Sequence, residues 1–443
     1  MKVSRRSFLA SATAMSVPFI LPSHVWGAPA KPNNLLTMGF IGMGKQNGGL
    51  LYNFLRRKTR VLAVCEVDRT RREAAAKKVN DYYEKKSGGS AGGCAAYNDF
   101  RELIARDDID AVCIATPDHW HTIPVLAALR SGKDVYCEKP LTYNIHEAVE
   151  VMKAVEANGR VLQTGSMQRS SSEFRIACEL VRNGVIGKLL RAECSFGDPG
   201  IPCDLPAEPM EPGLDWDLWQ GPAPIRPYNS ILSPRGLHTH FPHWRKYREY
   251  GGGGVTDWGA HHLDIAQWGL GMDHSGPVEV LPAPEGTRAK RGVTLVYANG
   301  VTVTHKKGFG IHFYGSNGEV QVNRGKFTLS IDGKQIAKYT QREDGGSLLS
   351  TVTKAEKRFL ANAKIKLYKS PGHADDFLNC VQSRKKPITN EIVGSRSVIC
   401  CHLTNLAYYH GQKMKWDPAK NRFVGGTGDP AWLTREYRSP WKL

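Results

Sequence analysis

The chain of 443 residues is 41% hydrophobic and 23% charged, a globular composition that excludes a disordered chain, a collagen-like repeat and a small disulfide scaffold. Its length predicts two or three domains. The formal net charge is +18, but the basic residues are mostly scattered and no nucleic-acid-binding motif is present, so we expect no nucleic-acid partner and leave a preference for anionic ligands open.

Residues 1–30 have the features of a twin-arginine export signal. Arg5 and Arg6 precede Phe8, a mildly apolar run over residues 10–21 and a small-residue site near Ala28. The apolar run is shorter than the roughly 20 residues that a membrane-spanning helix needs, and no other stretch is long enough. We therefore expect a periplasmic or otherwise exported protein without a stable membrane span once the signal is removed.

Residues 34–163 alternate between strand and helix patterns, which predicts a doubly wound parallel sheet. A strand over 35–41 leads into the glycine-rich turn 42–49 and a helix, and the next strand, 60–65, ends in Glu66. Glycines let the backbone approach a pyrophosphate at a helix N-terminus, and the acid accepts ribose hydroxyls, so this pattern favours dinucleotide binding. Asn47 stands where a third glycine is expected. The carboxylate of Glu66 would repel a 2′-phosphate, which favours NAD over NADP.

Two polar segments follow later strands of this domain. The loop Thr116–His121 comes after a strand over 111–115, and Glu138-Lys139-Pro140 comes after a strand over 133–137. Parallel sheets bind ligands at the carboxyl ends of their strands. Both segments are therefore candidates for the ligand site.

A long segment, residues 197–250, is rich in Pro, Trp and His and shows no periodicity. Segments of this kind are usually functional, and its tryptophans 216, 219 and 244 are candidates for stacking on sugar rings or for packing the segment itself. Three readings stay open for the histidines at 238, 240, 243, 261 and 262: contacts to sugar hydroxyls, surface or packing roles, and a zinc-like site. We assign no metal.

The remaining chain, residues 164–430, is predicted to form an α+β domain, followed by a tail over 431–443. Asp257, His261 and Asp264 have the spacing of one helix face. An antiparallel sheet of about six strands is expected over 278–331, with a hairpin at Asn299-Gly300. Helices should cover one face of this sheet and leave the other for oligomer contacts. Outside this region we expect a strand over 188–196 and helices over 172–183, 373–383 and 395–411.

The glycine turn, the loop Thr116–His121 and above all Glu138-Lys139-Pro140 resemble the Gfo/Idh/MocA family of glucose-fructose oxidoreductase and inositol dehydrogenase, and the resemblance covers essentially everything after the signal. It implies an α/β fold, with an N-terminal Rossmann domain and a C-terminal α+β domain that has a mainly antiparallel open sheet. The expected catalytic residues are Lys139, Asp257 and His261. The expected cofactor residues are Gly42, Gly44, Lys45, Gln46, Glu66, Thr116, Pro117, His121, Glu138, Lys139 and Gln168. The expected substrate residues are Arg169, His240, His243, Trp244 and His262.

The resemblance implies NAD-dependent oxidation of a ring hydroxyl in a sugar, polyol or glycoside. In such a reaction His261 would accept the hydroxyl proton, Lys139 would stabilise the alkoxide and Asp257 would orient the imidazole or accept a substrate hydroxyl. An exported enzyme has no obvious NAD pool, so we expect the cofactor to stay bound and to be recycled. Two alternatives are glycoside cleavage by oxidation, elimination and re-reduction, as in family 109 glycosidases, and non-catalytic sugar binding. A homo-oligomer formed through the C-terminal sheet is also expected.

Overall fold

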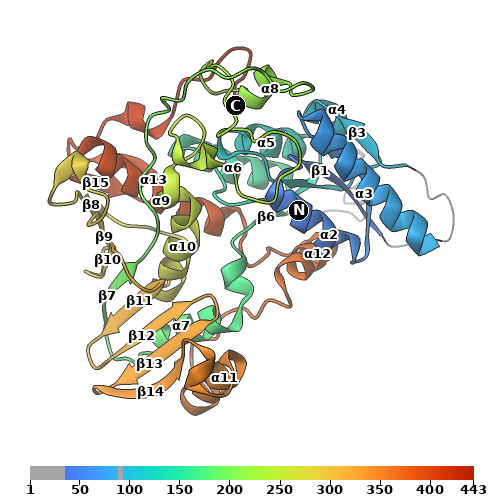
Figure 1. Ribbon diagram of the computed structural model, residues 1–443. Coiled ribbons are helices and arrows are strands. Elements are labelled where there is room, and N and C mark those ends of the chain that lie inside the picture. The colour runs from blue at the N-terminus through green and yellow to red at the C-terminus, as the bar shows by residue number, and fades with distance from the viewer. Residues whose placement is uncertain (1–34, 88–92) are drawn as a thin grey trace, which may run out of the picture. The chain divides into compact units, whose positions relative to one another are not determined.

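The first sheet of the computed structural model, which describes residues 35–87 and 93–443, has six parallel strands in the order β3-β2-β1-β4-β5-β6 (Figure 1). Its buried apolar strands confirm the predicted doubly wound parallel sheet. The predicted export signal lies outside the described residues. The strands are β1 (Leu36–Ile41), β2 (Thr59–Cys65), β3 (Ala95–Tyr97), β4 (Ala111–Ile114), β5 (Asp134–Cys137) and β6 (Leu162–Thr164).

Helices cover both faces of this sheet. One face carries α2 (Lys45–Leu55), α3 (Arg69–Ser87) and α12 (His373–Ser383), and the other carries α4 (Phe100–Ile104), α5 (Thr122–Arg130) and α6 (Ile145–Asn158). The helix α12 comes from far along the chain, yet its Phe377 packs edge-on against Phe54 and its Asp375 accepts two hydrogen bonds from Arg57, at 2.7 and 2.9 Å. Residues 36–443 accordingly form one compact unit, in which the predicted second domain helps to cover the first sheet.

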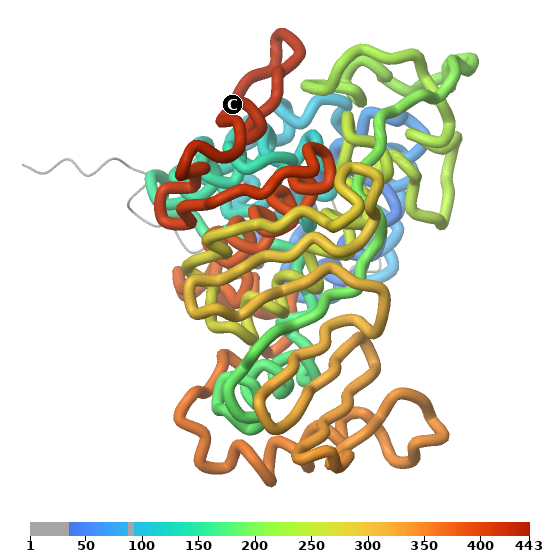
Figure 2. Tube along the Cα trace, turned by 90° about the vertical axis from the view of Figure 1, so that its left-hand side faces the viewer, coloured from blue at the N-terminus to red at the C-terminus, as the bar shows by residue number. Residues whose placement is uncertain are grey.

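The second sheet has ten strands in the order β14-β13-β12-β11-β7-β10-β9-β8-β15-β16, and Figure 2 looks toward it. All its pairs are antiparallel except β7 with β10. The strands are β7 (Leu189–Cys194), β8 (Glu279–Leu281), β9 (Thr294–Val296), β10 (Thr302–His305), β11 (Ile311–Gly315), β12 (Gly318–Asn323), β13 (Lys326–Ile331), β14 (Lys334–Tyr339), β15 (Met414–Asp417) and β16 (Arg422–Val424).

Three strands of this sheet were not expected from the sequence. The edge strand β14 has no fully buried position, so it lacks the apolar alternation that marks a half-buried strand, and lysines are common on such edges. The strands β15 and β16 are only four and three residues long. The predicted sheet of about six strands was therefore too small, although its mainly antiparallel pairing is confirmed.

Four helices pack against the second sheet: α7 (Ser172–Arg182), α10 (Gly259–Leu270), α11 (Leu348–Phe359) and α13 (Glu391–His410). The helix α11 falls partly in a basic stretch that predicted no element, and it buries only Val352 and Ala355. The helix α13 begins four residues before the predicted start because Asn390 caps it, accepting hydrogen bonds from the backbone N–H groups of Ile392 and Val393. Among the described residues, no helix has an apolar stretch long enough to cross a bilayer.

The segment 197–250 has a core of its own. It contains the short helix α8 (Trp216–Gln220), and the rings of Trp216 and Trp219 stack with their centroids 4.5 Å apart. Both indoles are buried, together with Tyr228 and Tyr250. Trp216 and Trp219 therefore pack the segment, and the hypothesis that they stack on a sugar is wrong.

The predicted tail, residues 431–443, packs on the first domain and on this segment. The ring of Trp441 lies 4.7 Å from that of Trp120, and Arg438 donates to the Gly221 carbonyl at 2.6 Å. Arg435 donates to the buried carboxylate of Glu147 at 3.0 Å. The tail thus connects the end of the chain to the loop after β4, which is part of the ligand site described below.

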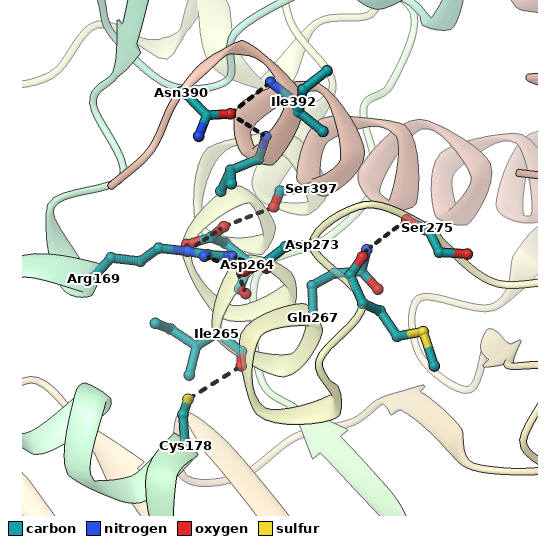
Figure 3. Close-up of polar contacts among 12 residues, drawn as sticks. Arg169, Cys178, Asp264, Ile265, Gln267, Asp273, Ser275, Asn390, Ile392 and Ser397 are labelled. Atoms are coloured by element: carbon teal, nitrogen blue, oxygen red, sulfur yellow. Dashed lines mark hydrogen bonds and ion pairs between the residues drawn. The ribbon is translucent and has the colours of Figure 1, made fainter. Parts of the chain in front are cut away.

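Arg169 lies at the centre of a buried ionic network (Figure 3). It belongs to the turn η2 (Met167–Ser170), and its guanidinium donates to both carboxylate oxygens of Asp264 at 3.0 and 2.9 Å and to Asp273 at 2.7 Å. Ser397 of α13 donates to the same Asp264 carboxylate at 2.7 Å. Because the Arg169 side chain is only 1% exposed and its donors are engaged, the hypothesis that it binds substrate is wrong.

We expect Arg169→Met to lower the free energy of unfolding by about 3–5 kcal/mol, because it leaves the buried Asp264 carboxylate without its counter-charge. Urea denaturation measures this difference. Lys77→Met is the matched control, since it breaks an exposed pair with Asp81 and should cost less than about 1 kcal/mol. If both variants unfolded at the same urea concentration and Arg169→Met instead lost sugar binding, Arg169 would be a substrate residue after all.

Candidate active site

The turn after β1 requires glycine at its first position. Gly42 has φ +81°, and a Cβ there would lie 2.8 Å from the backbone nitrogen of Thr116. Asn47, which stands in place of a third glycine, donates from its buried side chain to the carbonyls of Ile41 (3.1 Å) and Gly42 (2.9 Å). This amide holds the turn at the N-terminus of α2, where the free backbone N–H groups favour an anion. At Gly44 a Cβ would meet no atom within 4 Å, which leaves room for a phosphate.

A cleft runs from this turn along the carboxyl ends of β1, β2 and β4. Glu66, at the end of β2, accepts a hydrogen bond from the Met43 N–H at 2.7 Å, and burial raises the pKa of its carboxyl although Arg71 opposes this. Seven of the predicted cofactor residues line the cleft: Gly42, Gly44, Lys45, Gln46, Glu66, Thr116 and Pro117. The donors, the open glycine backbone and the buried acid fit a dinucleotide.

The arginines near Glu66 are engaged elsewhere. Arg71 donates to the carbonyls of Gly236 and Pro234, and Arg72 donates to the Glu66 carbonyl and to Asn98. Arg71 lines the cleft together with Glu66, but its guanidinium is held by the carbonyls of residues 234 and 236. The arrangement therefore favours NAD over NADP.

The segment 197–250 closes over the same cleft. Its backbone joins the end of β2 through hydrogen bonds from Arg69 N–H to the Gly213 carbonyl and from Asp215 N–H to the Val67 carbonyl, both 3.0 Å. Residues of this segment form one wall of the cleft: Leu218, Trp219, Leu232, Ser233, His238, Pro242, Trp244 and Arg245. A dinucleotide in the cleft would be covered by protein.

A second cavity of about 390 Å³ continues from the cleft and brings together the three predicted catalytic residues. The Lys139 ammonium lies 2.5 Å from Oδ1 of Asp257 and 3.0 Å from the Asp257 carbonyl. His261 is 6% exposed, and its buried Nδ1 has no hydrogen-bond partner among the described residues. The expectation of a single helix face needs correction: α9 (Gly253–Asp257) ends at Asp257, α10 begins at Gly259, and Trp258 joins them.

The charges around the cavity shift the pKa values of Asp257 and His261. Burial alone would raise the pKa of Asp257, but the Lys139 ammonium and the Arg245 guanidinium outweigh it and hold that pKa below its ordinary value. Burial, together with the same Lys139 and Arg324, holds the pKa of His261 well below its ordinary value. His261 is therefore a neutral imidazole at neutral pH, able to accept a proton.

Asp118, which the sequence did not single out, also lines this cavity. It lies in the turn η1 (Asp118–Trp120) after β4 and is 4% exposed. Burial raises the pKa of Asp118 to about 8, with Arg245 lowering it and Asp257 raising it. At neutral pH this carboxyl is mostly protonated. Its position in the loop Thr116–His121 was the one signal available.

Several predicted cofactor residues hold the catalytic groups in place. Gln46 donates to the Glu138 carboxylate at 2.8 Å, next to Lys139. The ring nitrogens of His121 lie 2.7 Å from the Pro140 carbonyl and 2.9 Å from that of Thr116, so the imidazole links the two loops. Gln168 is buried outside the cavity lining, and its amide satisfies its neighbours when the nitrogen faces the His261 carbonyl at 3.1 Å and the oxygen faces Nε of Arg324 at 3.2 Å.

The aromatic side chains open to this cavity are Phe241 and Trp258, which are 49% and 43% exposed. Trp244 lines it as well but is buried, with the Arg245 guanidinium 4.2 Å from its ring centroid. An exposed indole or phenyl face suits the C–H face of a sugar ring. Phe241 and Trp258 were missed because nothing in their local sequence distinguishes an exposed ring from a packed one.

Three predicted substrate histidines lie outside this cavity: the expected role of His240 and His262 needs correction, and that of His243 stays a prediction. His262 is buried, with Nδ1 2.5 Å from the Ser195 carbonyl. His240 is exposed and packs against the ring of His238 at 4.6 Å, and His243 lines a neighbouring cavity. In residues 35–87 and 93–443, no three His, Cys, Asp or Glu side chains are grouped so that they could hold a metal ion.

Models of one protein family match both parts of the chain. The model described as "Oxidoreductase family, NAD-binding Rossmann fold" matches residues 36–166, and that described as "Oxidoreductase family, C-terminal alpha/beta domain" matches residues 202–443. The chain belongs to the Gfo/Idh/MocA oxidoreductase family. The cofactor of this family member is accordingly NAD.

Curated relatives of this Gfo/Idh/MocA protein match only part of it. An inositol 2-dehydrogenase of Rhodococcus jostii is 38% identical over 128 residues, 28% of this chain and 35% of the relative. A glycosyl hydrolase family 109 protein of Shewanella is 29% identical over 210 residues, 43% of this chain and 45% of the relative. The chain thus spans less than half the length of these relatives.

Solved structures share the fold over most of the chain. The aldose-aldose oxidoreductase from Caulobacter crescentus superposes with a TM-score of 0.55 at 18% identity, covering 86% of this chain and 99% of that one. A levoglucosan dehydrogenase in complex with NADH gives a TM-score of 0.56 at 17% identity, with 86% and 98% coverage. At these identities the likeness concerns the fold alone.

We expect Asp118→Asn to be more stable than the unaltered protein at about pH 8.5, with the difference closing as the pH falls to about 4. The folded pKa of Asp118 is about 8 and that of an unfolded aspartate about 3.9, so its contribution to stability is fully present below the unfolded value and is lost as the pH rises through the folded value. Urea denaturation at several pH values measures the difference, and exposed Asp107→Asn is the control. A pH-independent difference would show that Asp118 is ionised in the folded protein.

Proposed function

We propose that this protein is an exported NAD-dependent oxidoreductase that acts on a ring hydroxyl of a sugar, polyol or glycoside. The observation that carries the proposal is the meeting of Lys139, Asp257 and His261 in one cavity, which shares Gln46, Thr116, Trp244 and Arg245 with the dinucleotide cleft. A substrate ring in this cavity has catalytic groups on one side and the cofactor cleft on the other.

NAD, held by the glycine turn and Glu66, would supply the redox chemistry as the acceptor of a hydride, the carbinol hydrogen with its electron pair. The chain supplies the proton chemistry. The Lys139 ammonium donates a hydrogen bond to the reacting hydroxyl oxygen and stabilises the charge that develops on it. Asp257, ionised and 2.5 Å from Lys139, holds the ammonium in position. The neutral His261 imidazole accepts the hydroxyl proton.

The proposal includes a cofactor that remains bound through repeated turnovers. Its support is the segment 197–250, which lines the cleft from above, and the tail, which fastens that segment through Arg438 and Gly221. Retention suits export through the twin-arginine pattern of Arg5 and Arg6, because that route carries folded proteins. The cofactor would be regenerated by a second substrate.

A second candidate function is glycoside cleavage through oxidation, elimination and re-reduction, and the similarity to the Shewanella family 109 protein favours it. Incubation with an aryl glycoside distinguishes the two, since only cleavage releases the free phenol without any added oxidant. Tight sugar binding without any change in the redox state of the cofactor would instead indicate a sugar-binding protein.

We also propose a homo-oligomer assembled through the open face of the ten-stranded sheet. The side chains on this face are polar or aromatic and only partly buried, as in Thr302, Thr304, His312 and Tyr314. Helices cover the opposite face. Light scattering coupled to gel filtration gives the oligomeric state.

We expect His261→Ala to lower kcat by about 10²–10⁴-fold, because the proton acceptor is lost, and Lys139→Ala to lower it by about 10²–10³-fold through lost charge stabilisation. Both variants should retain bound NAD, because neither residue is needed to bind its pyrophosphate. Single-turnover reduction of the bound cofactor by substrate measures the chemical step. Normal turnover of His261→Ala would exclude this histidine as the base.

We expect the purified protein to release nicotinamide dinucleotide on denaturation without any having been added, and Gly44→Val to release none. The valine has room within the protein, since no atom lies within 4 Å of the new Cβ, but it would occupy the space of the pyrophosphate. Exposed Gly49→Val, on the same helix, is the control. Absence of the dinucleotide from the unaltered protein, with no thermal stabilisation by added NAD, would overturn the proposal.

A further inference from the structure

A third cavity, of about 600 Å³, adjoins the active-site cavity. The two share Phe241, Arg245 and Asp257 in their walls. The third cavity is lined by five main parts of the chain: residues 197–201, the turn η3 (His243–Lys246), the helix α9, the turn η4 (Gly286–Arg288) and the end of α13. A substrate that reaches Lys139 and extends beyond one ring would enter this space.

Basic side chains dominate the lining of this cavity. Its five cationic residues are Arg245, Lys246, Arg248, Arg288 and Lys290, and its acidic residues are Asp198 and Asp257. Both carboxylates are already paired, Asp198 with Arg291 at 2.6 Å and with Lys290 at 3.7 Å, and Asp257 with Lys139. The lining therefore presents a surplus of positive charge to anything that enters.

The cationic side chains of the third cavity lie away from the site expected for the cofactor phosphates. The phosphates of a dinucleotide belong at the turn of Gly42 and Gly44, and neither glycine lines the third cavity. Lys246, Arg248 and Arg288 are exposed, so their charges are available to a ligand, whereas Lys290 is paired with Asp198. Phe241, 49% exposed at the boundary of the two cavities, has the Arg245 guanidinium 5.1 Å from its ring centroid, and the exposed part of the ring offers apolar surface to a sugar that crosses between them.

Resting on the function proposed above, we propose that the substrate is an acidic carbohydrate of at least two units. The ring that reacts lies against Lys139 and His261. A neighbouring unit lies in the third cavity, which we name the basic subsite, where its anionic group is bound by Lys246, Arg248 and Arg288. The group recognised is a fixed oxyanion, either the carboxylate of a uronic acid or a sulfate ester.

The experiment compares the binding of three disaccharides of the same linkage to the holoprotein by calorimetry: one neutral, one with a uronate unit and one with a sulfated unit. We expect one or both acidic disaccharides to bind at least about tenfold more tightly than the neutral one at low salt, and this preference to shrink as salt is added. The acidic ligand with the larger preference identifies the source of the oxyanion.

The double variant Lys246→Gln/Arg288→Gln should reduce the ratio of neutral to acidic dissociation constants by about tenfold, with the loss appearing in KM rather than in kcat. Lys354→Gln/Lys357→Gln removes two exposed charges from α11 and should leave the ratio unchanged, which controls for net charge.

Three results would overturn the inference: equal affinity for neutral and acidic disaccharides, failure of both acidic ones to bind, or the same loss of preference in the control variant. The proposed function fails separately, if the protein contains no NAD and no carbohydrate changes the redox state of added NAD. If a neutral disaccharide reduced bound NAD while the acidic ones did not bind, the inference of an acidic substrate would be wrong and the proposed function would still hold.

Discussion

The ion pair between Lys139 and Asp257 is the interaction on which the site depends. Lys139 follows β5 of the Rossmann sheet, and Asp257 ends α9, more than a hundred residues later, so the 2.5 Å contact joins the dinucleotide-binding half of the chain to the half that holds His261. The ammonium also affects the protonation states: it helps to keep Asp257 ionised, and it adds to the larger effect of burial in keeping His261 neutral. A lysine held by a carboxylate and a neutral histidine are the donor and the acceptor that the proposed reaction requires, and both line one cavity.

The cofactor cleft is covered by the segment 197–250, which is held in place by contacts other than the ion pair of Lys139 and Asp257. The segment 197–250 has almost no regular structure, yet its stacked tryptophans give it a core, and hydrogen bonds to residues 67 and 69 attach it to the end of β2. Opening the cleft would break these contacts together with those of the tail at Trp120 and Gly221. A covered cleft favours slow release of a bound dinucleotide, and this links the fold to the proposed export of a loaded protein.

The net charge of +18 is not spread evenly over the sites. In the active-site cavity, Lys139, Arg245 and Arg324 face three carboxyls, of which Asp118 is mostly protonated at neutral pH. In the basic subsite the cations outnumber the acids. A high net charge alone bears mainly on solubility. It supports an acidic substrate here only because these side chains surround a cavity next to the catalytic groups.

Local sequence patterns were enough to predict the features that depend on neighbouring residues, because strand periodicity and turn chemistry act over a few positions. These features are the first strand with its glycine turn and Glu66, the lysine after β5, and the hairpin at Asn299-Gly300. Which side chains are available to a ligand depends instead on the folded chain. Arg169 was predicted to bind substrate, but it is paired with Asp264, 95 positions away. Asp118 was marked only by its place in a candidate loop, and Trp258 and the basic subsite have no local signal. Burial and charge pairing depend on residues that only folding brings together, so a local pattern cannot distinguish an occupied side chain from an available one.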